Sequence, residues 1–425
     1  MSTQERVEFL KKFDPEIAVL LENEQRKQHD TIGLIASENI ASPLSVCLEG
    51  SIFTNKNTEG YPGKRYVGGT ENEDKVELIA IDRLKKLFGC GHANLQSGNA
   101  TIANSSVFMG ILKPGDTVLS MSLSDGGHLS HGARFHFSGK FYNIISYGVN
   151  KDNEQIDMNE VRRMALEHRP KMIICGGSAY PRLIDYKAFR EIADEIGAYL
   201  WVDAAHIIGM IAGGAIPSPV PYADVVTFST QKTLRGPRGC GVILCKEELK
   251  DKIDRGVFPG MQGGPKADMI AARAVLFKEC MTKEYKNYQQ QVLKNAKALA
   301  NGCLNQGLSL VSGGTDTHLA LVKVTDFVGS GREAELLLES VGIITNKNLI
   351  PFDPLSSNLT SGIRIGSPLM TTRGAKEQEM EYIGNLIGRT LKNKNNQEEL
   401  EKIKREVAAI TAKYPMFAKE WNVAE

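Results

Sequence analysis

Apolar residues recur at intervals of three and four along several stretches of the chain, and this spacing predicts amphipathic helices. The clearest stretch covers residues 73–88 and is closed by Gly89. Further helices are predicted over residues 9–29, 102–112, 158–167, 188–196, 285–305, 332–340, 376–391 and 398–413, and from about residue 266 to Cys280. The first of these has a start signal at Asp14-Pro15 and no evident packing partner of its own, so we expect it to pack on a second subunit.

Short apolar and β-branched runs alternate with these helices in the first half of the chain. They predict strands at residues 117–121, 141–145, 171–175 and 199–202. The alternation is typical of an α/β fold with a mostly parallel sheet and helices on both faces. It stops near residue 280, where strands at 308–311, 319–324 and 361–366 mix with long helices. We therefore expect an N-terminal arm (1–30), a large domain (31–280) and a smaller α+β domain (281–425).

A single lysine, Lys232, lies between two apolar runs that read as buried strands, residues 225–228 and 241–244. Burial favours the neutral form of an amine, and a neutral lysine is the nucleophile that forms a Schiff base with an aldehyde. The neighbouring hydroxyl groups suit a phosphate; they belong to Ser229, Thr230 and Thr233. The alternative is a hairpin lysine that only solvates a turn.

Polar clusters follow three of the predicted strands: residues 125–128, Ser178 and residues 203–206. Each has a simpler explanation, because an aspartate after a strand is often a turn residue and a lone histidine is often structural. However, ligands bind at the carboxyl ends of parallel strands. A carboxylate, two histidines, hydroxyl groups and one lysine are all predicted at this same edge, which points to a single site.

Two further segments allow both a functional and a structural interpretation. Residues 55–69 hold four glycines with Glu59 and Arg65 among them, which fits either a binding loop or a solvated charge cluster. Residues 96–101 place small polar side chains at a predicted helix start. This arrangement is typical of an anion site, but the same residues are ordinary helix caps.

Composition excludes several classes of function. The chain has 425 residues, 42% of them hydrophobic, and a formal net charge of +1, so no overall charge favours nucleic acid or an anionic membrane. Its seven cysteines show no CxxC pair and no metal-ligand spacing, which indicates reduced thiols. The N-terminus is polar, and no apolar run approaches the length of a membrane span. We expect a cytoplasmic protein.

Nine segments together resemble the serine hydroxymethyltransferase family. They are IASEN (35–39), EGYPGKRY (59–66), GGHLSHG (126–132), SAY (178–180), VDAAH (202–206), KTLRGPRG (232–239), QGGP (262–265), NKN (346–348) and SGIRIGSP (361–368). They occur in order over nearly the whole chain. The resemblance implies a pyridoxal 5'-phosphate enzyme with the aspartate-aminotransferase-like fold, also called fold type I, acting as a homodimer or a dimer of dimers with shared active sites.

The resemblance also implies a role for each matching residue at the cofactor. Lys232 would hold the cofactor as a Schiff base, and Asp203 would keep the pyridine nitrogen protonated so that the ring accepts electrons. His128 would stack on the ring, while His206 and Ser178 would bond its phenolate side. The remaining cofactor contacts would come from Thr101, Ala100, Gln231 and, from the neighbouring subunit, Gly263 and Gly264. Thr230 completes the implied catalytic group of Lys232, Glu59, His128 and Asp203, and no metal is implied.

Other matching residues would bind the substrate and tetrahydrofolate. Arg364 would grip the substrate carboxylate through its planar guanidinium, assisted by Ser37, with Tyr66 also in the substrate site. Glu59 would handle protons on the substrate hydroxyl and on folate. The implied folate site consists of Glu59, Leu123, Gly127, Leu129 and Asn348. The implied reaction cleaves the Cα–Cβ bond of serine and passes the one-carbon unit, as formaldehyde, to tetrahydrofolate.

Several residues depart from the family pattern. Gln231 stands where the family has histidine, and Asn57 and Val67 stand where it has two active-site tyrosines. Further departures are Ala100, Lys266-Ala267 and Asn358. The first three make a substrate wall smaller or more polar, which suggests an α-substituted substrate such as α-methylserine, with alanine as its product.

Two other functions remain open at this point. One keeps the cofactor but not folate, as an aldolase or transaldolase of threonine-like amino acids; Asn358 favours it, whereas Glu59 and Asn348 favour folate. The other is an inactive protein that keeps the fold; the intact Lys232, Asp203 and Arg364 argue against it.

Overall fold

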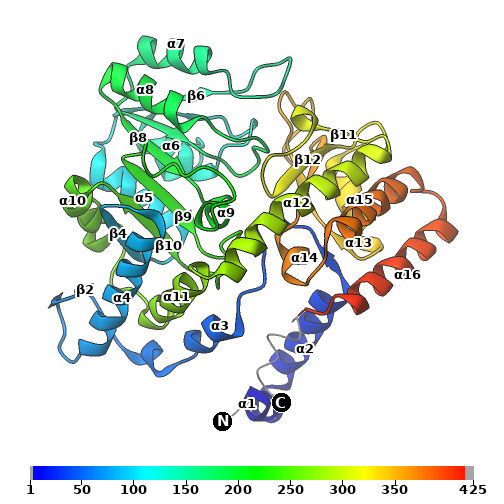
Figure 1. Cartoon of the computed structure of the whole chain (residues 1–425), viewed down its shortest axis with the longest axis horizontal. Coiled ribbons are helices and arrows are strands. Elements are labelled where there is room, and N and C mark those ends of the chain that lie inside the picture. Colours follow the sequence, from blue (N-terminus) through cyan, green and yellow to red (C-terminus); the bar gives the residue numbers. More distant parts are fainter. Residues whose placement is uncertain (1–2, 417–425) are drawn as a thin grey trace.

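The computed structural model describes residues 3–416 and is built around a seven-stranded sheet (Figure 1). In chain order the strands are β4 (His92–Ser97), β5 (Thr117–Met121), β6 (Asn143–Tyr147), β7 (Met172–Cys175), β8 (Tyr199–Asp203), β9 (Val225–Ser229) and β10 (Gly241–Cys245). Their order across the sheet is β4-β10-β9-β8-β7-β5-β6. Strand β10 runs antiparallel to both of its neighbours, β4 and β9, and every other adjacent pair in the sheet is parallel. The predicted α/β class with a mostly parallel sheet is therefore confirmed.

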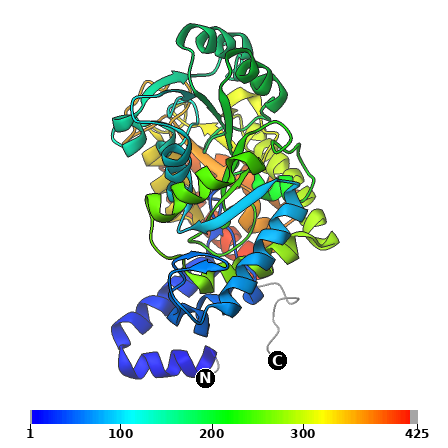
Figure 2. The ribbon, with the colours of Figure 1, turned by 90° about the vertical axis from the view of Figure 1, so that its left-hand side faces the viewer.

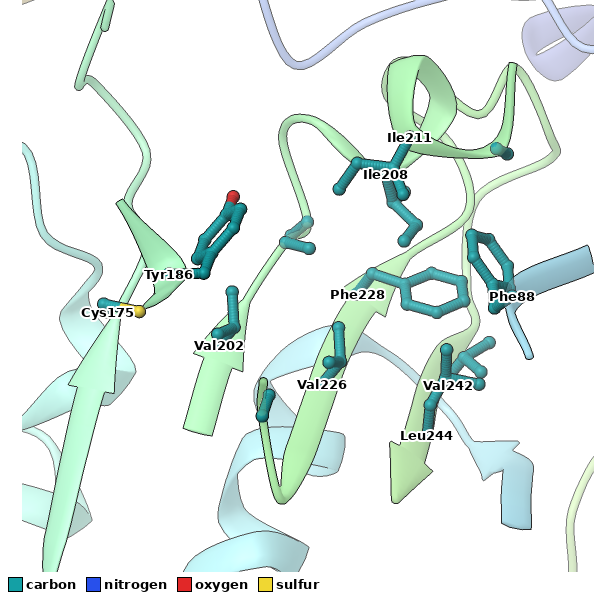
Figure 3. Packing of buried hydrophobic residues seen from close by; sticks show 14 of the residues in the cluster. Phe88, Cys175, Tyr186, Val202, Ile208, Ile211, Val226, Phe228, Val242 and Leu244 are labelled. Atoms are coloured by element: carbon teal, nitrogen blue, oxygen red, sulfur yellow. The ribbon is translucent and has the colours of Figure 1, made fainter. Parts of the chain in front are cut away.

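The two faces of this sheet carry separate cores because side chains alternate along each strand. The surrounding helices include α4 (Glu71–Phe88), α5 (Ala100–Ile111), α7 (Met158–His168), α8 (Tyr186–Ile196), α10 (Lys250–Arg255) and α11 (Ala267–Cys280). Val202, Val226 and Phe228 pack on one face with residues of α4, α8 and α11 (Figure 3). Trp201 and Val225 pack on the other face with residues of α5 and α10. The sheet is thus a rigid layer between two layers of helices.

A second unit surrounds a four-stranded antiparallel sheet with the order β11-β12-β15-β14. Its strands are β11 (Ser309–Leu310), β12 (Leu319–Lys323), β14 (Asn346–Asn348) and β15 (Gly362–Gly366), and its main helices are α12 (Lys283–Asn305), α13 (Gly331–Ser340), α15 (Glu377–Lys392) and α16 (Gln397–Lys413). Ile32 and Leu34, which the sequence placed with the large domain, pack in this second core. The reason is that β1 (Ile32–Gly33) pairs with β13 (Ile343–Ile344).

Two predicted elements differ from the structure. The N-terminal arm is not one helix over residues 9–29 but two, α1 (Thr3–Phe13) and α2 (Pro15–Asp30). Asp14 separates them, and its Oδ1 caps the second by accepting from the Ile17 backbone N–H at 3.1 Å. The strand predicted at residues 141–145 begins later, at Asn143, because Phe141 ends the short helix α6 (Phe137–Phe141).

The arm projects from the body of the molecule, with both described chain ends on the same side (Figures 1 and 2). Several of its apolar side chains are exposed, including Phe13, Ile17 and Leu20. Packing on a second subunit stays a prediction. No helix within residues 3–416 is both long and apolar enough to cross a membrane. All seven cysteines lie in this range and are free thiols, as predicted.

Candidate active site at the carboxyl edge of the large sheet

Lys232 lies in the loop between β9 and β10, as predicted, and is partly buried. Burial lowers the pKa of its amine to about 8; Asp203 opposes this shift, while Arg364 and Arg238 add to it. The backbone around the lysine is fixed. The Thr233 hydroxyl donates to the His206 carbonyl at 2.8 Å. The loop therefore holds a reactive amine at one place on the sheet edge.

The same loop packs so closely against the backbone at residue 209 that only glycine fits there. A Cβ at Gly209 would lie 2.1 Å from the Thr233 carbonyl oxygen. Thr230 is fully buried, and its hydroxyl donates to the Pro237 carbonyl at 2.9 Å. Buried Arg273 also donates to Pro237, at 2.7 Å. The hydroxyl of Thr230 is thus used within the loop, and its expected catalytic role stays a prediction.

Asp203 ends β8, and its buried carboxylate has three hydrogen-bond partners. Oδ2 lies 2.8 Å from Asn104 Nδ2 and 2.9 Å from His131 Nε2, and Oδ1 accepts from the Ala205 N–H at 3.0 Å. Burial alone would raise the pKa of the carboxyl, but the His131 hydrogen bond, together with the charge of Lys232, holds that pKa well below its usual range. Asp203 therefore remains an anion.

The tautomer of His131 follows from its other ring nitrogen. The backbone N–H of His128 donates to His131 Nδ1 at 3.4 Å, so a neutral His131 carries its proton on Nε2 and donates to Asp203. His128 lies beside it, with ring centroids 5.6 Å apart. Burial lowers the pKa of His128 to about 4, with a further contribution from His131. A neutral, half-buried ring at this place suits stacking on a flat aromatic ligand.

His128, His131 and Asp203 present ligand atoms within 4.8 Å of one another, a spacing that would also suit a metal ion. Most of these atoms already have partners, since His131 bonds Asp203 and His128 Nδ1 lies 2.7 Å from the Ser130 hydroxyl. The carboxylate of Asp203 would also pair well with the protonated ring nitrogen of an aromatic cofactor.

Arg364 comes from β15 of the second unit and reaches the edge of the large sheet. Its Nη1 donates to the Ser178 carbonyl at 2.6 Å, and its Nε donates to Asn346 Oδ1 at 3.2 Å. Burial lowers the pKa of the guanidinium to about 10, so it stays cationic at neutral pH. The structure thus brings Arg364 to Ser178, and the charge of Arg364 acts on Lys232. Ser37 forms no hydrogen bond with Arg364 within residues 3–416.

A pair of buried histidines completes this side of the site. His206 Nδ1 lies 3.2 Å from His318 Nε2. Burial and the charges of Lys232 and Arg364 lower the pKa of His206 well below its usual range, and burial with the Arg364 charge lowers that of His318 to about 3. Both rings are therefore neutral, and each is available as a hydrogen-bond partner without adding charge.

Two hydroxyl groups without a partner in the described part of the chain lie near the start of α5. The helix is capped by Asn99, whose Oδ1 accepts from the Ile102 N–H at 2.9 Å. Ser97 and Ser229 both pair with Gly241 across the sheet, and their buried hydroxyl groups have no partner within residues 3–416. Two unused buried hydroxyls beside a helix N-terminus fit the phosphate of pyridoxal phosphate. Thr101 is exposed and Ala100 half-buried at this helix start.

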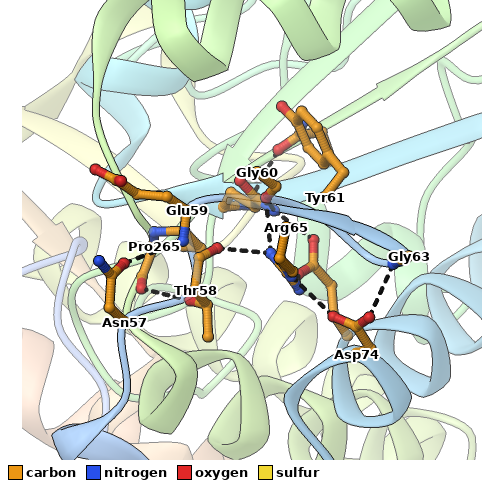
Figure 4. Close-up of polar contacts among 12 residues, drawn as sticks. Asn57, Thr58, Glu59, Gly60, Tyr61, Gly63, Arg65, Asp74 and Pro265 are labelled. Carbon is orange, nitrogen blue, oxygen red and sulfur yellow. Dashed lines mark hydrogen bonds and ion pairs between the residues drawn. The ribbon is translucent and has the colours of Figure 1, made fainter. Parts of the chain in front are cut away.

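Glu59 lies in a second polar cluster, next to the QGGP segment (Figure 4). A Cβ at Gly264 would lie 3.0 Å from Glu59 Cγ, and one at Gly263 would lie 3.4 Å from Glu59 Oε1. Gln262 connects this cluster to residues 96–101, which lead into α5, since its Nε2 donates to the Gln96 carbonyl at 2.6 Å. No hydrogen bond joins Glu59 to Lys232 or to Arg364 in the described part of the chain. The contact expected between Gly263 and Gly264 and the cofactor of a neighbouring subunit stays a prediction.

The three residues expected to form one substrate wall do not meet within a single chain. Asn57 is exposed, and its Oδ1 accepts from the Glu59 N–H at 3.1 Å. Val67 is half-buried, and nearby Tyr66 is 75% exposed. Gln231 instead lines a cavity of about 600 Å³ with Ser37. A common wall would therefore need the loop of a second subunit.

The expected folate residues divide between the two units. Leu123 and Leu129 are 41% and 43% exposed on either side of His128. Gly127 between them is buried, and a Cβ there would lie 2.3 Å from the Met121 carbonyl oxygen. Asn348 lies on β14, with its Nδ2 donating to the Leu349 carbonyl at 2.7 Å. The first three are brought together beside His128, and the fourth comes from the other unit.

Four residues of the site were not identified from the sequence: Asn104, His131, His318 and Asn346. Two of them lie in segments that carried a signal, because His131 belongs to GGHLSHG and Asn346 to NKN. Asn104 and His131 are 99 and 72 positions from Asp203 in the chain, so only the fold brings them to it.

Comparison with known protein families identifies the family of this chain. The family described as serine hydroxymethyltransferase matches residues 10–387. This range includes Lys232, Asp203, Arg364 and all the other site residues described above.

Proposed function

Because the chain belongs to the serine hydroxymethyltransferase family, we propose that it cleaves the Cα–Cβ bond of serine or an α-substituted serine and passes the one-carbon unit to tetrahydrofolate. The family consists of fold type I transferases that use pyridoxal phosphate, with tetrahydrofolate as co-substrate. The arrangement that carries the proposal is a half-buried lysine at the sheet edge, with buried Asp203 and half-buried Arg364 near enough for both charges to act on its amine. Burial lowers the pKa of this lysine to about 8. When bound, pyridoxal phosphate supplies an electron sink for the charge left at Cα.

The chain's own residues would hold the cofactor as follows. Asp203, kept ionised by His131 and Asn104, would hold a proton on the pyridine nitrogen. His128 would cover one ring face, and His206 with Ser178 would bond the phenolate oxygen. The phosphate would lie among Ser97, Ser229 and Thr101 at the start of α5, with Ala100 and the partner's Gly263 and Gly264 closing the loop.

Other residues would bind the substrate and move its protons. Arg364, oriented by Asn346, would bind the carboxylate, with Ser37 nearby. Glu59 of a neighbouring subunit would take the proton of the substrate hydroxyl as the bond to Cβ breaks. Leu123, Gly127, Leu129 and Asn348 would position tetrahydrofolate to capture the one-carbon unit. These roles require a homodimer, and the free thiols suit a cytoplasmic protein.

The α-substituted substrate is the finer part of the proposal. Asn57, Val67 and Gln231 are smaller than, or differ in polarity from, the aromatic and imidazole side chains at the matching family positions. A second subunit would bring the first two to the site of the third, leaving room for a methyl group on Cα.

A substrate panel tests the function. Serine, α-methylserine and threonine are assayed for cleavage, each with and without tetrahydrofolate. We expect tetrahydrofolate-dependent transfer, with α-methylserine consumed at least as fast as serine. A much faster reaction with serine would refute the α-substituted substrate alone. Threonine cleavage that ignores folate would indicate an aldolase. A protein that takes up no pyridoxal phosphate would be an inactive scaffold.

A further inference from the structure

Arg65 is the centre of the polar cluster that contains Glu59 (Figure 4). Its side chain is only 3% exposed although it lies on a two-residue strand, β3 (Lys64–Arg65), that pairs only with β2 (Gly60–Tyr61). Its Nε donates to Asp74 Oδ1 at 2.8 Å, and its Nη2 donates to Glu77 Oε2 at 2.6 Å. Both carboxylates belong to α4, so the guanidinium is fixed to a helix that packs on the large sheet.

The remaining donor of Arg65 holds the backbone on both sides of Glu59. Nη1 donates to the Thr58 carbonyl at 2.8 Å and to the Gly60 carbonyl at 2.7 Å. The Gly60 carbonyl also accepts from Gln96 Nε2 at 3.0 Å. The Thr58–Glu59 and Gly60–Tyr61 peptide groups are therefore tied to α4, and the second of them also to β4.

The carboxylate of Glu59, in contrast, accepts no hydrogen bond within residues 3–416, and Figure 4 shows it pointing away from the guanidinium. Its backbone N–H and carbonyl are both used, by Asn57 Oδ1 at 3.1 Å and by the Tyr66 N–H at 3.0 Å. The main chain of this residue is thus fixed while its side chain is left available. A proton-transfer group needs this arrangement, since a displacement of about 1 Å can cost a factor of about 100 in rate.

We propose that Arg65 is a positioning residue for Glu59, acting through the two flanking carbonyl groups rather than by touching substrate. The inference rests on the proposed role of Glu59 in proton transfer. A lysine cannot replace this arginine, because its single ammonium cannot reach two carboxylates and two carbonyls that lie in different directions around a planar fork. Substrate binding at Arg364 and cofactor binding at Lys232 do not depend on it.

The test compares Arg65→Lys, Glu59→Gln and the double variant as holoenzymes, with Arg389→Lys as a matched control. Arg389 also pairs with two carboxylates, those of Glu399 and Glu406, but lies in the second unit away from this cluster. We expect Arg65→Lys to lower kcat by about 10- to 100-fold with little change in the KM for the amino acid. In the Glu59→Gln background, Arg65→Lys should not lower kcat further, because the carboxylate that Arg65 positions is already absent.

Hydrogen exchange of the peptide covering residues 57–66 gives a readout independent of activity. It should speed up in Arg65→Lys and stay unchanged in Arg389→Lys and in Glu59→Gln. Unchanged exchange in Arg65→Lys, or kcat effects of the two single changes that multiply in the double variant, would overturn the proposal.

The experiment also covers two other outcomes: a variant that does not fold, and a Glu59 variant that keeps its activity. If Arg65→Lys does not fold, Asp74→Asn, which weakens the same clamp from α4, is measured in its place under the same criteria. If Glu59→Gln transfers the one-carbon unit at the wild-type rate, the role proposed for Glu59 is wrong, and the exchange rates alone decide whether Arg65 positions this backbone.

Discussion

The lowered pKa of Lys232 leads to a quantitative prediction for the cofactor-free protein. Its pKa falls from 10.5 to about 8, mainly through burial. At pH 7 an amine with a pKa of 8 is about 9% neutral, whereas one at 10.5 is about 0.03% neutral, a ratio of about 300. Because only the neutral amine attacks an aldehyde, this ratio is the advantage that the fold gives Lys232 over an ordinary lysine.

The same shift has a consequence for stability, with a definite sign. Between pH 8 and 10.5 the folded amine has released a proton that the unfolded amine still holds, so folding stability rises with pH in this window. Below pH 8 the buried ammonium destabilises the cofactor-free fold by about 3 kcal/mol. Lys232→Met should therefore unfold at a higher urea concentration at pH 7, and its advantage should vanish by about pH 10.5.

The assay is reductive methylation at a series of pH values, followed by mass spectrometry of the peptide that contains Lys232. Partial burial slows the labelling but does not move its midpoint, which we expect near pH 8. Asp203→Asn should lower the midpoint, because the carboxylate opposes the shift, and Arg364→Met should raise it. A wild-type midpoint near 10.5, or shifts of the opposite sign in the two variants, would refute the reasoning.

Three other substitutions test separate parts of the structure. His131→Phe removes a buried donor from Asp203, and urea titration of the cofactor-free protein should show a loss of about 1–3 kcal/mol; an unchanged midpoint would contradict the assigned hydrogen bond. Arg373→Met removes a buried guanidinium that donates to backbone carbonyls of α2 and α16; limited proteolysis should cut the N-terminal arm faster, and equal rates would show that the arm is held elsewhere. Gly209→Ala places a Cβ against the Thr233 carbonyl, and thermal unfolding should report a destabilisation of about 3 kcal/mol, whereas a neutral result would mean that the lysine loop can shift.

The sequence predicted those elements whose side chains follow a regular apolar pattern. Strand 117–121 and the helix ending at Phe88 are confirmed at the same boundaries or within two residues. Strand β4 was not identified because polar residues alternate along it. Its Asn94 and Gln96 are buried but donate to Tyr61 and Glu77, so the strand is stabilised by hydrogen bonds that no hydrophobic pattern shows.

Site residues were predicted where the residue type and its place next to a strand both indicated a function. They were missed where their importance depends on a partner that is distant in the sequence. Lys232 could be identified because it is a lysine between two predicted strands. Asp203 could be identified because it is a carboxylate directly after a predicted strand. His131 did not, because a lone histidine gives no sign of a carboxylate 72 positions away. Arg65 was placed in a mixed charge cluster that could have been solvated, and its burial depends on two carboxylates of a helix that begins six residues later.

The most direct measurement is borohydride reduction of the protein loaded with pyridoxal phosphate, followed by peptide mapping. Reduction fixes the cofactor on the amine that holds it. We predict a single pyridoxyl adduct on Lys232 and none in Lys232→Met. An adduct on a different lysine, or equal labelling of the variant, would contradict the assignment of this edge of the sheet as the active site.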